Sequence, residues 1–147
     1  MRLPTFRTPE EAILDWFPGI PCRVLASARE GDDAYVLVDT TPDGRPGLYG
    51  ATAARQDGGW VEGTGGTAPG WTRTDAEHGL GTATVWGKTP EGAVRVRAVL
   101  GDDVREVPVA NGVYLMAWWR VPAPGAVRPR VDAFRIDNRW VPARAAP

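Results

Sequence analysis

Turn-forming residues divide the chain into short β-prone runs, and this division limits the fold more than any other feature. Runs such as DAYVLVDT and GLYGATAAR alternate with the turn sequences GDD (31–33), PDG (42–44) and DGG (57–59). Runs of this length suit strands, and the 18 Gly and 14 Pro in 147 residues are more than a helical protein tolerates. We therefore predict a mainly β protein whose neighbouring strands are antiparallel.

The segment TPEEAILDWFPG, residues 8–19, is the exception because it has the pattern of a helix. Thr8 and Glu11 have capping-box spacing, and the Pro-Gly pair at 18–19 ends the helix after about three turns. One side of this helix carries an apolar stripe formed by Ala12, Ile13, Trp16 and Phe17. A short helix with such a stripe is expected to lie on a sheet face.

The length of 147 residues fits a single domain, 1–147, which we divide into three parts. Residues 1–62 hold the helix and an antiparallel β-meander. Residues 63–80, rich in Gly and Thr, are expected to form a long loop between the halves. Residues 81–147 are expected to form a second antiparallel layer. The predicted fold is an antiparallel β-sandwich of about nine or ten short strands with one short N-terminal α-helix.

Two segments of the chain share a pattern. ATAARQDGGWV (51–61) and VDAFRIDNRWV (131–141) each have a β-prone run, a turn sequence and a returning Trp-Val pair. Both are predicted to be hairpins whose tryptophan packs back on the sheet.

Within the second half, GTATVWGKTPEGAVRVRAVL and the later VPVANGVYL carry a pattern of turn glycines, a proline and alternating apolar residues. The pattern is formed by Gly81, Val85, Gly87, Pro90, Gly92, Ala93, Val94, Val96, Gly112 and Tyr114. In this order the residues resemble the transthyretin-like and carboxypeptidase-regulatory-like β-sandwich domains, over residues 81–115 only. The resemblance implies that the second layer, residues 81–147, is Ig-like and that the protein is a non-catalytic accessory or adhesion module.

The run ANGVYLMAWWRVP (110–122) is the most apolar of the chain and places Trp118 beside Trp119. Neighbouring residues of a strand point to opposite faces, so the two tryptophans cannot belong to one core layer. One face of this strand would carry Val113, Leu115, Ala117 and Trp119, and the other Tyr114, Met116, Trp118 and Arg120. The first set is small and branched and suits a sandwich core, whereas the second has the composition of protein interfaces.

The face of Trp118 has two interpretations. Either the N-terminal helix or the first meander covers it, which fits the helix's need for a sheet, or the face is open to a partner. Function through this strand depends on the second interpretation. We predict a non-catalytic interaction or accessory module that binds a protein partner, or a second copy of itself, through a sheet face and adjoining loops. The predicted partner-binding residues are Tyr114, Met116, Trp118 and Arg120.

The segment TDAEHG gathers Asp75, Glu77 and His78, whose side chains can bind metals or transfer protons. Metal sites normally use three or four ligands, and the chain has a single His, so a solvated loop is the simpler interpretation. A small or metal-dependent enzyme that uses this loop is the alternative. Cys22 would need His78 and Asp75 to become a nucleophile, and nothing in the sequence order brings them together. No cofactor is predicted.

The net charge of −1 is unevenly spread. Residues 31–70 carry two Arg against six carboxylates, whereas residues 120–147 carry six Arg against two Asp. Neutralisation of the two segments across the fold is the simpler interpretation, and a basic end that meets an acidic partner is the other.

Two further binding functions stay open. A nucleic-acid binder would use a platform of Trp118 and Tyr114 beside Arg120, Arg128, Arg130 and Arg135. The overall acidity of the chain argues against nucleic acid. A small-ligand carrier would instead hold a cavity between the sandwich layers.

The sequence also bears on location. The N-terminal stretch has no apolar segment with a cleavage site, and the single Cys22 has no partner for an internal disulfide. No apolar run approaches the roughly 18 residues that a membrane span needs. We therefore expect a cytoplasmic protein without a membrane segment.

Overall fold

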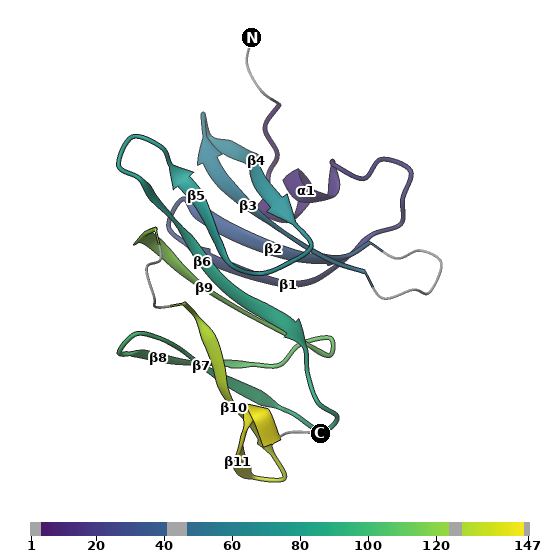
Figure 1. Cartoon of the computed structure of the whole chain (residues 1–147). Helices are drawn as coiled ribbons and strands as arrows, with labels where there is room; N and C mark the ends of the chain where they lie inside the picture. Colours follow the sequence, from purple (N-terminus) through teal and green to yellow (C-terminus); the bar gives the residue numbers. More distant parts are fainter. Residues whose placement is uncertain (1–3, 41–46, 124–127, 146–147) are drawn as a thin grey trace.

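The computed structural model describes residues 4–40, 47–123 and 128–145, and within them the chain forms eleven strands in three antiparallel sheets with one short α-helix (Figure 1). This confirms the predicted mainly β fold with an N-terminal helix, and the number of strands is slightly above the predicted nine or ten. The expected PDG turn at 42–44 lies outside the described residues.

The three sheets are named here by their place in the chain. The meander sheet has the order β1 (Arg23–Glu30), β2 (Asp33–Asp39), β3 (Leu48–Gln56) and β4 (Gly59–Gly66). The middle sheet has the order β5 (Trp71–Asp75), β6 (Leu80–Lys88) and β9 (Val113–Pro122). The C-terminal sheet has the order β11 (Arg139–Pro142), β10 (Arg130–Ile136), β7 (Arg95–Leu100) and β8 (Asp103–Pro108).

The sheets stack in layers, with the helix α1 (Pro9–Leu14) on the outside of the meander sheet (Figure 1). The other face of the meander sheet packs on the middle sheet, and the middle sheet packs on the C-terminal sheet with its second face. The alternation of a strand therefore serves two cores: Val36 of β2 faces the helix, while its neighbour Leu37 faces the middle sheet. Between the first two sheets, Trp86 Nε1 donates a buried hydrogen bond to the hydroxyl of Tyr35 at 2.9 Å.

The prediction of a long loop over 63–80 is wrong, because this segment holds the end of β4 and all of β5. Two of its glycines serve close packing instead. A Cβ at Gly63 would overlap Thr52 Oγ1, and one at Gly65 would overlap the hydroxyl of Tyr49. Thr52 Oγ1 also accepts a hydrogen bond from the Thr64 N–H at 2.9 Å, which holds β4 against β3 past a bulge.

The second half of the chain also differs from the prediction of one layer over 81–147. β6 and β9 belong to the middle sheet, whereas β7, β8, β10 and β11 form the C-terminal sheet. The chain therefore changes layers twice between β6 and β9. The result is a central layer, β5-β6-β9, with a four-stranded sheet on each side.

The helix begins as predicted and ends early. Thr8 Oγ1 accepts a hydrogen bond from the Glu11 N–H at 3.1 Å, so the cap is present. The helix has six residues, and Trp16 and Phe17 follow it in tight turns with their rings edge-on to Tyr49. The stripe packs on the meander sheet, where Ala12 and Ile13 are fully buried and Trp16 and Phe17 are half-buried.

Candidate functional site

The predicted partner-binding face of β9 is covered. The faces themselves are as predicted, because Val113, Leu115 and Ala117 pack toward the meander sheet while Met116 and Trp118 pack the opposite way. Trp118 is only 3% exposed. The cover is the C-terminal sheet, and not the helix or the meander that the sequence offered as candidates. The expectation of an open face at Met116 and Trp118 is therefore wrong.

Trp118 is also fixed by polar contacts from β8. Its Nε1 donates a hydrogen bond to Asp103 Oδ2 at 2.8 Å. The guanidinium of Arg105 lies 5.1 Å from the centre of the indole ring and is itself bonded to Asp103 at 2.8 Å. Its surroundings are thus those of a core residue tied to the edge of a neighbouring sheet.

The other two predicted residues lie apart from it. Tyr114 is half-buried with its ring edge-on to Phe134, 5.7 Å between centroids, and burial raises the pKa of its hydroxyl. Arg120 was expected on the face of Trp118, but β9 gains one residue against β6 at this point. Arg120 takes a φ of 55° in this bulge. Its guanidinium then reaches the meander sheet, 3.3 Å from Asp33 Oδ2.

The loop residues Asp75, Glu77 and His78 do not form a metal centre. His78 Nδ1 lies 2.8 Å from Asp75 Oδ2, and this contact lowers the pKa of the Asp75 carboxyl. The His78 and Asp75 side chains are 64% and 41% exposed. Across residues 4–40, 47–123 and 128–145, no three His, Cys, Asp or Glu side chains are gathered where they could hold a metal ion. Cys22 is half-buried, and burial raises the pKa of its thiol.

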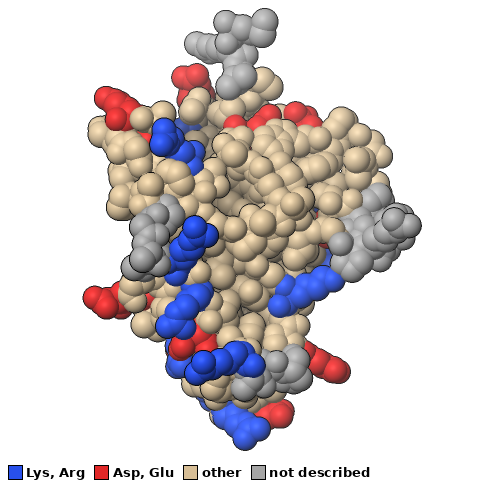
Figure 2. All heavy atoms as spheres, viewed as in Figure 1, with Lys and Arg blue, Asp and Glu red and all other residues tan. Residues whose placement is uncertain are grey.

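The residues of the nucleic-acid alternative are likewise separated. Trp118 is buried and offers no ring for stacking, and Arg120 is paired with acidic residues of the meander sheet. Arg135 lies over the ring of Trp140, and Arg130 lies 3.8 Å from Asp132. On the face drawn in Figure 2, Lys and Arg gather mostly over the lower half, which holds the C-terminal sheet.

A different site comes from the free edge of β9. β9 is the last strand of the middle sheet, paired with β6 on one side. Val113 exchanges backbone hydrogen bonds with Ala110 at 3.0 and 3.1 Å, so its N–H and C=O point away from β6. Because this direction alternates along a strand, the backbone groups of Leu115 and Ala117 point the same way. Within the part of the chain that the structure describes, no strand is hydrogen-bonded to them on this side.

The gap beside this edge exists because β8 and β9 separate after their common turn. β8 follows β7 into the C-terminal sheet, and β9 follows β6 into the middle sheet. Arg105 of β8 spans the gap once, where its Nη1 donates to the carbonyl of Ala117 at 3.1 Å. The N–H and C=O of Leu115 and the N–H of Ala117 are left facing a groove of about 730 Å³.

The groove has two walls, and near each end one side-chain contact joins β9 or the turn before it to the meander sheet. β1 and β8, each the edge strand of its own sheet, form the walls, and the small side chains of Ala26 and Ala28 line the β1 side. At one end, Asn111 Nδ2 donates to the carbonyl of Leu25 at 2.8 Å. At the other end, Arg120 joins β9 to the β1–β2 hairpin through Asp33. Burial raises the pKa of the Asp33 carboxyl, and the positive charge of Arg120 opposes part of this rise. The edge of β9 is thus recessed between two other edges.

The sequence carries a partial signal for this site in β8. The run VREVP of β8 places charges and a proline on one short strand, which is how natural proteins protect an edge. Nothing comparable marks β9, because it is protected by its neighbours rather than by its own side chains.

No family model, no curated protein and no solved structure matches this chain. The resemblance of residues 81–115 to transthyretin-like and carboxypeptidase-regulatory-like domains therefore stays a prediction. The part of the chain that the structure describes contains no helix with the length and apolarity that a membrane span requires.

Proposed function

We propose that this protein is a non-catalytic binding module that takes up an extended segment of a partner protein in the groove beside β9. The observation that carries the proposal is the recessed edge of β9. There the N–H and C=O of Leu115 and the N–H of Ala117, two buried residues, are hydrogen-bonded to no strand of the described chain. An added strand would supply those hydrogen bonds through its main chain.

The walls of the groove indicate what such a segment looks like. Ala26 and Ala28 form an apolar wall, so the side chains that face β1 are expected to be apolar. The wall from Ala26 to Glu30 has the length of about five extended residues at roughly 3.3 Å each. Arg29 and Arg105 are offset by Glu30 and Glu106 at the rim, so the groove favours an uncharged segment.

A flexible segment of another protein suits this site better than a second copy of the same edge. The β9 edge lies between β1 and β8, which stand in the way of an identical recessed edge. The resemblance of residues 81–115 to accessory domains and the lone Cys22, which suits the reducing cytoplasm, agree with a cytoplasmic interaction module.

The proposal can be tested with a phage-displayed library of random heptapeptides selected on the purified protein. Binders should share apolar side chains at alternating positions, because only one face of the added strand meets the β1 wall. Ala28→Arg places a long side chain in the groove and should weaken a synthetic binder by at least about tenfold. Titration calorimetry would measure the dissociation constants.

The matched control is Ala76→Arg, which makes the same change at an exposed position in the β5–β6 turn. This variant should bind as the unchanged protein does. A library without binders, or binders that Ala28→Arg and Ala76→Arg affect equally, would overturn the proposal.

A further inference from the structure

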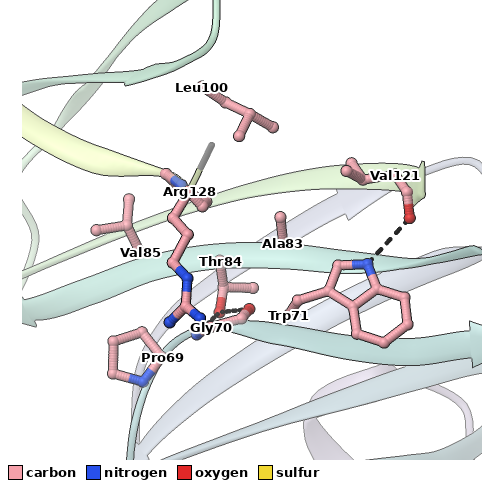
Figure 3. A pocket seen from close by; sticks show the side chains of 10 residues that line it. Pro69, Gly70, Trp71, Ala83, Thr84, Val85, Leu100, Val121 and Arg128 are labelled. Atoms are coloured by element: carbon pink, nitrogen blue, oxygen red, sulfur yellow. Dashed lines mark hydrogen bonds between the residues drawn. The ribbon is translucent and has the colours of Figure 1, made fainter. Parts of the chain in front are cut away.

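A second hollow lies between the middle sheet and the C-terminal sheet, in the region of β5 and β6 rather than of β1 and β8. Its volume is about 340 Å³. Its walls are mainly apolar and include Trp71, Val85, Leu100 and Val121. Figure 3 shows the side chain of Arg128 extending across it toward Thr84.

The polar groups of this pocket are nearly all engaged within the protein. Thr84 Oγ1 donates to the carbonyl of Gly70 at 3.2 Å and accepts from its N–H at 3.3 Å. Trp71 Nε1 donates to the carbonyl of Val121 at 3.0 Å (Figure 3). Arg128 differs, because within the described residues its guanidinium has neither a hydrogen bond nor an ion pair.

An unpaired guanidinium over apolar walls favours a ligand that has a negatively charged group and an apolar remainder. Its fork of N–H donors matches the two oxygens of a carboxylate, and the fixed positive charge strengthens those hydrogen bonds. The remaining walls offer contact area but no free hydrogen-bonding side chain among the residues described, so the rest of a ligand must be apolar. The volume lies at the small end of ligand pockets, which span about 300 to 1,000 Å³.

We propose that this pocket binds a small apolar monocarboxylic acid, with the carboxylate on Arg128 and the hydrocarbon part against Trp71, Val85 and Leu100. This site is separate from the groove beside β9, and the two proposals are independent of each other. Among the described strands only β9 lines both hollows, with Val121 in this pocket and with Val113, Leu115 and Ala117 in the groove.

Phenylacetate is a suitable probe, since it joins a carboxylate to an aromatic group of the right size. Its neutral analogue phenylacetamide has nearly the same shape without the charge. Titration of the ¹⁵N-labelled protein followed by amide NMR should place the largest shifts at Trp71, Thr84 and Val85. Phenylacetate should bind at least about tenfold more tightly than phenylacetamide, because only the anion forms charged hydrogen bonds with Arg128.

Arg128→Gln should remove that preference by weakening phenylacetate about tenfold and leaving phenylacetamide unchanged. Arg128 is exposed, so the variant is expected to fold. Arg130→Gln is the matched control, because Arg130 is an exposed neighbour outside this pocket's lining, and it should leave both probes unchanged. Equal affinity for the two probes, equal effects of the two variants, or no shifts at the pocket with millimolar phenylacetate would overturn the proposal.

Discussion

Trp118→Ala is expected to lower the free energy of unfolding by about 3 to 5 kcal/mol, the range for a buried aromatic residue truncated to alanine. The indole is 3% exposed and packs between β9 and the C-terminal sheet. The substitution also removes the donor to Asp103 and the ring under Arg105. Urea denaturation followed by circular dichroism would measure the loss.

Trp119→Ala is the internal comparison for this result. Trp119 follows directly in the chain but is only half-buried, on the face toward the meander sheet. Its loss should be clearly smaller, about 1 to 2 kcal/mol, since burial of the removed surface sets the magnitude. A larger loss for Trp119→Ala than for Trp118→Ala would contradict the layer order described above.

Trp60→Ala is expected to have a similarly large effect, about 3 to 5 kcal/mol. Trp60 is 2% exposed and lies where the helix and the N-terminal stretch meet the meander sheet. Its backbone exchanges hydrogen bonds with Phe6 at 2.7 and 2.9 Å. The guanidinium groups of Arg29 and Arg55 lie 4.6 and 5.1 Å from its ring centre.

Trp140 provides a matched control because it stands at the same place in the second of the two similar hairpins. It too lies under two arginines, Arg97 at 4.9 Å and Arg135 at 5.8 Å, but it is half-buried. Trp140→Ala should therefore lower the free energy of unfolding by only about 1 to 2 kcal/mol. Comparable losses of unfolding free energy for both variants in urea denaturation would contradict this. They would mean that the packing of Trp60 against the helix adds nothing to its contribution within the hairpin.

Local features were predictable from the sequence because they depend on neighbouring residues. Both similar segments form hairpins, with left-handed turn residues Asp57 and Gly58 in one and Asp137 and Asn138 in the other. The alternation that separates Trp118 from Trp119 is likewise a local property of a strand. The helix cap at Thr8 belongs to the same class.

The number of layers was not predictable in this way. Apolar faces on consecutive strands show that something covers them, but not which element does so. For a covered Trp118 face the sequence offered the helix or the meander as the cover, and for an open face a partner, whereas the chain covers it with β7, β8 and β10. Arg120 was misplaced for another reason, since a one-residue bulge reverses the face of every later side chain.

The candidate site was missed because an edge is a property of strand order in space. Leu115 and Ala117 look like ordinary core residues in the sequence, and their side chains are buried as expected. Their backbone groups face a groove only because β8 and β9 diverge beyond the Ala110–Val113 pair, each into its own sheet.

Amide hydrogen exchange along β9, measured residue by residue by NMR, tests the recessed edge most directly. The N–H groups of Met116 and Trp118 point to β6 and should exchange slowly. Those of Leu115 and Ala117 face the groove and should exchange much faster, although all four residues are buried. A groove-binding heptapeptide should then slow exchange at Leu115 and Ala117 selectively. Uniformly slow exchange in the free protein, or no added protection at these two amides with the peptide bound, would contradict the account.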